Sequence, residues 1–158
     1  MTGPDIHVVT AKELAAMRLL LPTSIDYLSV SSYKIADVLG VHFRAGEWGK
    51  QRCGSVFTCV FKGRSVYGRV DRFLKMDGME NEYLFASVVW FSVPTYPFGN
   101  PLVVEVTLDG SKLDREIGCV IPVTVIDPSR VMVEMPQPGC DVYRMMRDSG
   151  YDTKKLHL

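Results

Sequence analysis

The segment Ser65–Pro101 reads SVYGRVDRFLKMDGMENEYLFASVVWFSVPTYPFGNP, and it decides the fold class of this chain. It holds two runs of β-branched and aromatic residues, Ser65–Leu74 and Tyr83–Phe91, separated by a short acidic turn. Such runs are typical of β-strands, and the turn between them predicts a hairpin. The prolines after Phe91 cannot continue a central strand, so we expect the following loop to lie where the sheet ends.

The same pattern recurs on both sides of this hairpin. Glycine in Lys62–Arg64 and in Leu108–Ser111 predicts tight turns, and Pro128 fixes a third turn between Asp127 and Ser129. Seven short strands without long intervening helices predict a mainly β domain, built as a small barrel or a sandwich. Besides the two strands of the hairpin, the expected strands are Lys34–Phe43, Ser55–Phe61, Leu102–Leu108, Cys119–Ile126 and Arg130–Met135.

Short helices are expected at both ends of the chain. Thr10 and Glu13 form a T-x-x-E capping box, which begins a helix that Pro22 ends at about Leu21. Near the other end, Asp141–Ser149 is expected to form a two-turn helix closed by Gly150. The expected organisation is a single domain over residues 1–158, with a helical lead-in at 1–32, a β core at 33–136 and a helix and tail at 137–158.

Length and composition favour an ordinary globular domain. The 158 residues are 47% hydrophobic and 23% charged, which is enough apolar material for one core. The formal net charge is zero, whereas proteins that hold nucleic acid mainly by its phosphates usually carry a basic excess. No apolar run reaches the roughly 18–20 residues that span a bilayer, so we expect no membrane partner.

The cysteines and the first residues indicate the expected compartment. The N-terminus, Met1–Thr10, lacks a basic region followed by an apolar stretch, so no signal peptide is expected. The spacing of the cysteines matches neither a redox pair nor a zinc knuckle, and free thiols in a reducing compartment are expected. Cytoplasm or nucleus follows as the expected location. The four cysteines are Cys53, Cys59, Cys119 and Cys140.

Motifs for catalysis are missing from the sequence. Of the three histidines, His7 and His157 lie near the termini, and His42 lies in an expected strand with no local sign of a general base. No glycine-rich phosphate loop or metal motif is present, so we expect no enzyme activity, no metal and no cofactor. Three neighbouring acids, Asp71, Asp77 and Glu80, flank a turn, where solvated charge is the default.

Aromatic residues mark a candidate binding site at the end of the central hairpin. Trp90 lies near the end of the second expected strand, and Tyr96 and Phe98 follow in the proline-rich loop. Aromatic faces that line an open box attract a methylated ammonium group by cation–π contact, worth roughly 0.5–2 kcal/mol each. Burial of these rings in the core is the competing interpretation.

The same residues carry a resemblance to a known family. The run Y-G-R-V-D-R-F-L from Tyr67, followed by an acidic turn and V-x-W-F-x-x-P ending at Pro94, resembles the central signature of bromo-adjacent-homology (BAH) domains. Cys119–Val123 is similar to their closing strand. The resemblance covers roughly Lys34–Met135 and implies an SH3-like β-barrel that binds proteins or nucleosomes. It further implies nuclear location and a histone tail or other peptide as partner.

The resemblance also implies specific site residues. In family members that read methyl-lysine, the matching positions form an aromatic cage, here Tyr67, Trp90 and Tyr96, with Phe98 as a possible fourth wall. The sequence departs from the family where Val93-Pro94-Thr95 stands in place of Arg-Pro-Glu. The acid that would pair with a lower methylation state is therefore missing.

Two alternative functions remain open. The first is a nucleic-acid-binding accessory domain, similar to modules of mobile-element-type proteins, for which DNA would be a secondary partner. The second is a structural interaction domain in which the C-terminal helix, through Met145 and Met146, docks a partner. The basic residues that would contact phosphates in the first alternative are Arg44, Lys50, Arg52, Lys62 and Arg64. The oligomeric state is not determined by the sequence.

Overall fold

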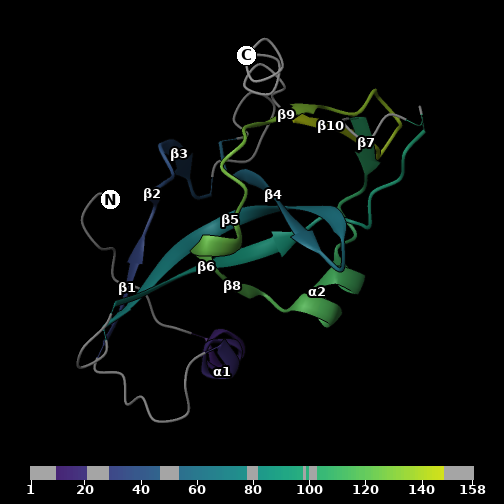
Figure 1. The fold of residues 1–158 in the computed structure, drawn as a ribbon. Coiled ribbons are helices and arrows are strands. Elements are labelled where there is room, and N and C mark those ends of the chain that lie inside the picture. Colours follow the sequence, from purple (N-terminus) through teal and green to yellow (C-terminus); the bar gives the residue numbers. More distant parts are fainter. Residues whose placement is uncertain are drawn as a thin grey trace.

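The computed structural model describes residues 10–20, 29–46, 54–77, 82–97, 99 and 103–147 (Figure 1). Within these residues the chain is mainly β, as expected. The elements in chain order are α1 (Ala11–Leu20), β1 (Ser29–Tyr33), β2 (Ile35–Val38), β3 (Val41–Arg44), β4 (Val56–Phe61), β5 (Arg64–Asp77), β6 (Glu82–Trp90), β7 (Val103–Val106), α2 (Ser111–Ile117), β8 (Val120–Pro122), the 3₁₀ turn η1 (Val123–Val125), β9 (Val131–Glu134) and β10 (Tyr143–Arg147).

The long hairpin of β5 and β6 organises the largest sheet. The strand order is β1-β5-β6-β8, and β4 pairs with the first half of β5 while β1 pairs with its second half. A bulge at Asp71 shifts the register between β5 and β6, so that Val70 faces Val88 and Arg72 faces Ser87. The hairpin predicted from Ser65–Pro101 is therefore confirmed, and both of its strands are present.

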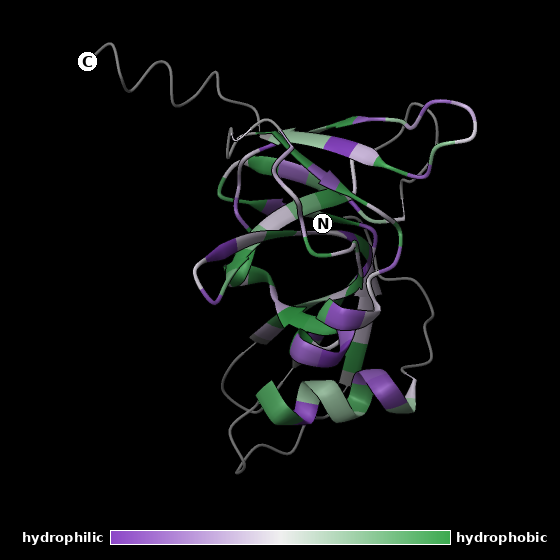
Figure 2. Cartoon of the chain, turned by 90° about the vertical axis from the view of Figure 1, so that its right-hand side faces the viewer, coloured by the Kyte–Doolittle hydropathy of each residue, from purple (hydrophilic) through white to green (hydrophobic). Residues whose placement is uncertain are grey.

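Two smaller sheets complete the architecture. The order β7-β10-β9 forms a three-stranded antiparallel sheet, and β2 and β3 form a separate hairpin. The described strands do not close into a barrel. The three-stranded sheet and the two helices lie at opposite ends of the molecule (Figures 1 and 2).

Apolar side chains gather in three buried clusters. The largest lies between the main sheet, the β2–β3 hairpin and α2, and it contains Phe57, Trp90 and Leu113. The second joins the main sheet to the three-stranded sheet through Tyr67 and Met145. The third lies under α1 and contains Met17, Leu74, Met76, Phe85 and Val120.

Local signals in the sequence placed several elements correctly. The capping box is confirmed, because Glu13 N–H donates to Thr10 Oγ1 at 3.1 Å and Thr10 N–H donates to Glu13 Oε1 at 3.1 Å. The turn at Lys62–Gly63 is confirmed with φ angles of 52° and 76°. Ser129 N–H donates to Asp127 Oδ1 at 2.8 Å, which confirms that turn.

Four predictions of secondary structure were wrong in whole or in part. The expected strand Cys119–Ile126 is only three residues long, as β8 (Val120–Pro122), and the 3₁₀ turn η1 (Val123–Val125) follows it. The expected strand Lys34–Phe43 is a hairpin, since Leu39 and Gly40 both take positive φ and reverse the chain. The expected turn Leu108–Ser111 leads into helix α2, because Asp109 Oδ1 accepts a hydrogen bond from Ser111 N–H at 3.2 Å. The expected helix Asp141–Ser149 contains strand β10, which pairs with β7 on one side and β9 on the other.

Candidate functional site

Tyr67 and Trp90 do not form the predicted aromatic cage, because they face opposite sides of the main sheet. Gly68 is the residue opposite Trp90 in the register of β5 and β6, so Tyr67 points the other way. Tyr67 is fully buried in the cluster beneath the three-stranded sheet, and Trp90 is 2% exposed in the largest cluster. The prediction that these two rings line one open box was wrong.

Trp90 is held by a specific set of contacts. Its ring meets the Phe57 ring edge to face, with centroids 5.5 Å apart and planes at 63°. Its indole Nε1–H donates to the carbonyl oxygen of Gly118 at 2.8 Å, at the C-terminal end of α2. The Trp90 side chain therefore packs the core and positions α2.

The other two cage residues lie apart from this arrangement. Tyr96 is exposed in the loop after β6, next to Thr95, which exchanges two backbone hydrogen bonds with Glu105 at 3.0 Å each. Phe98 lies outside the described residues. Tyr96 thus remains an exposed aromatic residue beside β7, and neither Tyr67 nor Trp90 shares an open surface with it.

The predicted basic surface is divided in the described part of the chain. Lys62 and Arg64 flank the exposed tip of the β4–β5 hairpin. Arg44 lies at the opposite end of β4, since its N–H donates to Gly54 just before that strand. The six residues of β4 span about 20 Å, so these cations do not form one patch. Lys50 and Arg52 lie outside the described residues.

His42 sits opposite Asp37 in the β2–β3 hairpin, with Nδ1 2.6 Å from Asp37 Oδ1. Both side chains are exposed, so the contact is a surface hydrogen bond of the kind expected for a strand histidine. Across the described residues, no group of three or more His, Cys, Asp or Glu side chains is arranged to hold a metal ion.

A cleft of about 310 Å³ opens where both helices meet β6. We call it the Trp90 cleft. Its size is at the lower end of ligand pockets, which suits one side chain or a small molecule. Its rim carries two exposed apolar residues, Val89 (43% exposed) and Leu108 (52% exposed). The lining residues are Lys12, Val88, Val89, Trp90, Leu108, Gly110, Ser111, Asp114 and Cys119.

An ion pair joins the two helices at the edge of the Trp90 cleft. Lys12 Nζ of α1 lies 2.9 Å from Asp114 Oδ2 of α2, and the hydrogen bond to Asp114 raises the pKa of Lys12 above its ordinary value. Exposed pairs of this kind contribute less than about 1 kcal/mol, so a charged ligand can exchange with either partner at small cost. Burial raises the pKa of the nearby Cys119 thiol, which is therefore protonated at neutral pH.

The position of Lys12 is fixed by its neighbour in the capping box. Glu13 is buried against the main sheet, where its Oε2 lies 3.6 Å from Arg72 Nε. Burial opposes ionisation of Glu13, but the hydrogen bonds from Thr10 and Ser87 and the charge of Arg72 together hold its pKa below the ordinary value. The sequence identified this cap, yet it gave no sign that α1 would border a cleft, because α2 was not foreseen.

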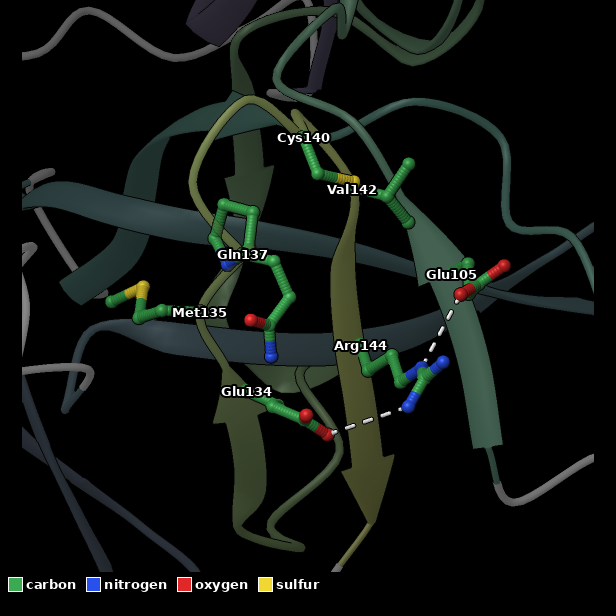
Figure 3. Close-up of a pocket in the computed structure, with 8 residues that line it drawn as sticks. Glu105, Glu134, Met135, Gln137, Cys140, Val142 and Arg144 are labelled. Carbon is green, nitrogen blue, oxygen red and sulfur yellow. Dashed lines mark hydrogen bonds and ion pairs between the residues drawn. The ribbon is translucent and has the colours of Figure 1, made fainter.

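A second, smaller depression lies on the outer face of the three-stranded sheet, with a volume of about 140 Å³. Arg144 of β10 crosses its floor between two acids, with Nε 3.3 Å from Glu105 Oε2 and Nη1 3.9 Å from Glu134 Oε2 (Figure 3). These three residues belong to three adjacent strands in register. We call this depression the outer-face pocket; its other lining residues are Met135, Pro136, Gln137, Cys140 and Val142.

Comparisons with known proteins do not assign the chain to a family: no family model, no curated protein and no solved structure matches it. Neither helix in the described ranges is long and apolar enough to cross a membrane.

Proposed function

We propose that this chain is a non-enzymatic protein-interaction domain that binds a short peptide segment of a partner at the Trp90 cleft. The observation that carries the proposal is the pairing of exposed apolar residues with an exchangeable ion pair around one cavity. Val89 and Leu108 offer apolar surface to a partner side chain, and Asp114 offers a carboxylate to a basic one. Interfaces commonly combine an apolar centre with a polar rim in this way.

A basic tail is the partner class that this arrangement favours. An incoming lysine that reaches Asp114 replaces the Lys12 ammonium at similar electrostatic cost, and its aliphatic stem lies along Val89 and Leu108. Histone tails are basic, and they are also the partners that the resemblance to BAH domains implies. A histone tail and nuclear location are therefore part of the proposal, together with an SH3-like relationship of the β core. The proposal does not include recognition through a cage of Tyr67 and Trp90.

The test is calorimetric titration of the full chain with histone-tail peptides, unmodified and lysine-methylated. Leu108→Asp places a charge on the apolar rim, and we expect it to weaken binding at least roughly tenfold. Leu39→Asp is the matched control, because Leu39 is also an exposed leucine (85%, against 52% for Leu108) and lies in the distant β2–β3 turn. Asp114→Lys should weaken the binding of basic peptides and spare that of neutral ones.

Two results would count against the proposal. If no histone-tail peptide binds, the partner class is wrong. If peptides bind equally to the wild type and to Leu108→Asp, the Trp90 cleft is not the binding site.

A further inference from the structure

The edge of the three-stranded sheet carries a self-complementary segment. β9 pairs with β10 on one side, and no described strand pairs with its other side. Unpaired edges of this kind accept another strand, because their backbone N–H and C=O groups on that side need partners.

The side chains of the segment 130–134 alternate cleanly between two environments. Arg130, Met132 and Glu134 are exposed on the outer face, whereas Val131 and Val133 are half-buried against the second core cluster. Met132 is 52% exposed, which is unusual for so large an apolar side chain. Along the strand, the exposed side chains are therefore basic, apolar and acidic in turn, with Met132 at the centre.

We propose that β9 pairs antiparallel with β9 of a second copy of this chain, with Met132 opposite the partner's Met132 on the two-fold axis. In this register Arg130 faces the partner's Glu134, and Glu134 faces the partner's Arg130. Val131 faces the partner's Val133 on the inner face. Each chain thus supplies the complementary charge that the other needs, as a two-fold interface requires. Opposite charges directly across an antiparallel pair are stabilising, and like charges are destabilising.

Alternative registers lose this complementarity. A shift by one residue places inner-face valines beside outer-face residues, which the pleat of the sheet does not allow. A shift by two residues places Glu134 or Arg130 opposite Met132 and leaves both charges without a partner across the strand. The flanking prolines are also placed symmetrically about Met132, because Pro128 and Pro136 each lie four residues from it. They end the ladder at both ends, since proline has no N–H to donate.

The neighbouring strands support the same arrangement. On the outer face, Met132 lies opposite Met146 of β10, which lies opposite Val103 of β7. The proposed pairing continues this apolar row across the two-fold axis into the second copy. The contact between Arg144 and Glu134 measures 3.9 Å, longer than a charge-assisted hydrogen bond. Glu134 is also 54% exposed, so its carboxylate is accessible to the partner's Arg130.

The strand is short, so we expect a weak and reversible dimer. Sedimentation velocity of the full chain should show its mean sedimentation coefficient rising with protein concentration. Arg130→Glu alone places two acids opposite each other twice, and Glu134→Arg alone does the same with two cations. We expect each variant to raise the dissociation constant at least roughly tenfold.

An equimolar mixture of these two variants gives the decisive result. In the mixed pair every acid again faces a cation, so the mixture should associate although each variant alone does not. Lys112→Glu, an exposed charge reversal on α2, is the matched control and should associate like the wild type. Thermal unfolding of each variant establishes that it is folded.

A wild type that stays monomeric at every concentration, or a mixture that stays monomeric, overturns the proposal. Single variants that associate as strongly as the wild type also overturn it. Leu108→Asp leaves this edge unchanged, so failure of the peptide-binding proposal and failure of this one are distinguishable.

Discussion

The close approach of Gly110, the residue before helix α2, to Trp90 of the main sheet predicts that Gly110→Ala strongly destabilises the protein. Gly110 is the residue before α2, and a Cβ atom built on it would lie 1.9 Å from the Trp90 carbonyl oxygen and 2.5 Å from its carbonyl carbon. Both are backbone atoms of β6, so neither can move aside without displacing the strand. The φ angle of Gly110 is −90°, which alanine adopts without strain. The expected effect is therefore purely steric.

The magnitude follows from the contacts that α2 loses when Gly110, the residue before it, is displaced from Trp90. Leu113 is 2% exposed, and displacing it from the core costs about 2–3 kcal/mol. The hydrogen bond from Trp90 Nε1 to Gly118, at the other end of α2, contributes about 1 kcal/mol. Replacing glycine by alanine gains back about 0.4–1 kcal/mol through the unfolded chain. The net loss in the free energy of unfolding is about 2–3.5 kcal/mol.

Urea unfolding followed by circular dichroism measures this loss. Lys112→Ala is the control, because Lys112 lies two residues after Gly110 and is exposed. It should change the free energy of unfolding by less than about 0.5 kcal/mol. Leu113→Ala should destabilise on its own, and the double variant with Gly110→Ala should lose less than the sum, because both act through the same helix. A Gly110→Ala protein as stable as the wild type would refute the steric reasoning.

Three further outcomes are expected. The pKa of Glu13 lies below that of an unfolded glutamate, so its contribution to stability is complete above about pH 5 and is lost as the pH falls through the lowered pKa. Glu13→Gln should therefore flatten the acid side of a curve of unfolding free energy against pH, and an unchanged curve would contradict this. Lys12→Met removes the exposed pair with Asp114 and should change the free energy of unfolding by less than about 1 kcal/mol, measured by urea unfolding. Exposed Cys140 should react with iodoacetamide faster than Cys119, whose pKa burial raises, as peptide mass spectrometry would show; the reverse order would be inconsistent with the structure.

Features that depend on local chemistry were predictable from the sequence. The reciprocal hydrogen bonds of Thr10 and Glu13 involve residues three apart, and the Lys62–Gly63 turn needs only a glycine that accepts positive φ. The strands of the central hairpin follow from their own composition. In each case the stabilising partner lies within a few residues, so no knowledge of the rest of the fold is needed.

Features that depend on distant partners were not predictable. Val142, Met145 and Met146 have helical spacing, but Tyr143 and Met145 also alternate as in a strand. The choice is made by β7 and β9, which supply backbone partners on both sides of β10 and bury Met145 completely. The seven residues of α2 are too few for a clear periodic pattern, and its N-cap residue, Gly110, makes no side-chain capping hydrogen bond that a sequence motif could announce.

The candidate site was misplaced for a related reason. Aromatic residues of neighbouring strands lie on one face only if the register puts them there, and a sequence does not state its register. Here Gly68 occupies the position opposite Trp90, and a Cβ atom on it would lie 3.0 Å from the Phe57 ring and 3.1 Å from the Trp90 ring. Gly68 therefore leaves room for two core aromatic rings.

Trp90 still matters to the proposed site, through its effect on the shape of the cleft. Its carbonyl oxygen lies against Gly110 at the start of α2, and its indole N–H binds the Gly118 carbonyl at the end. Both ends of the helix are thus fixed to a single residue of β6, which places Asp114 within reach of Lys12 and leaves Leu108 on the rim. A tryptophan that positions a short helix in this way supports the proposed site through the fold, because the rim residues can contact a partner only while the helix keeps its place.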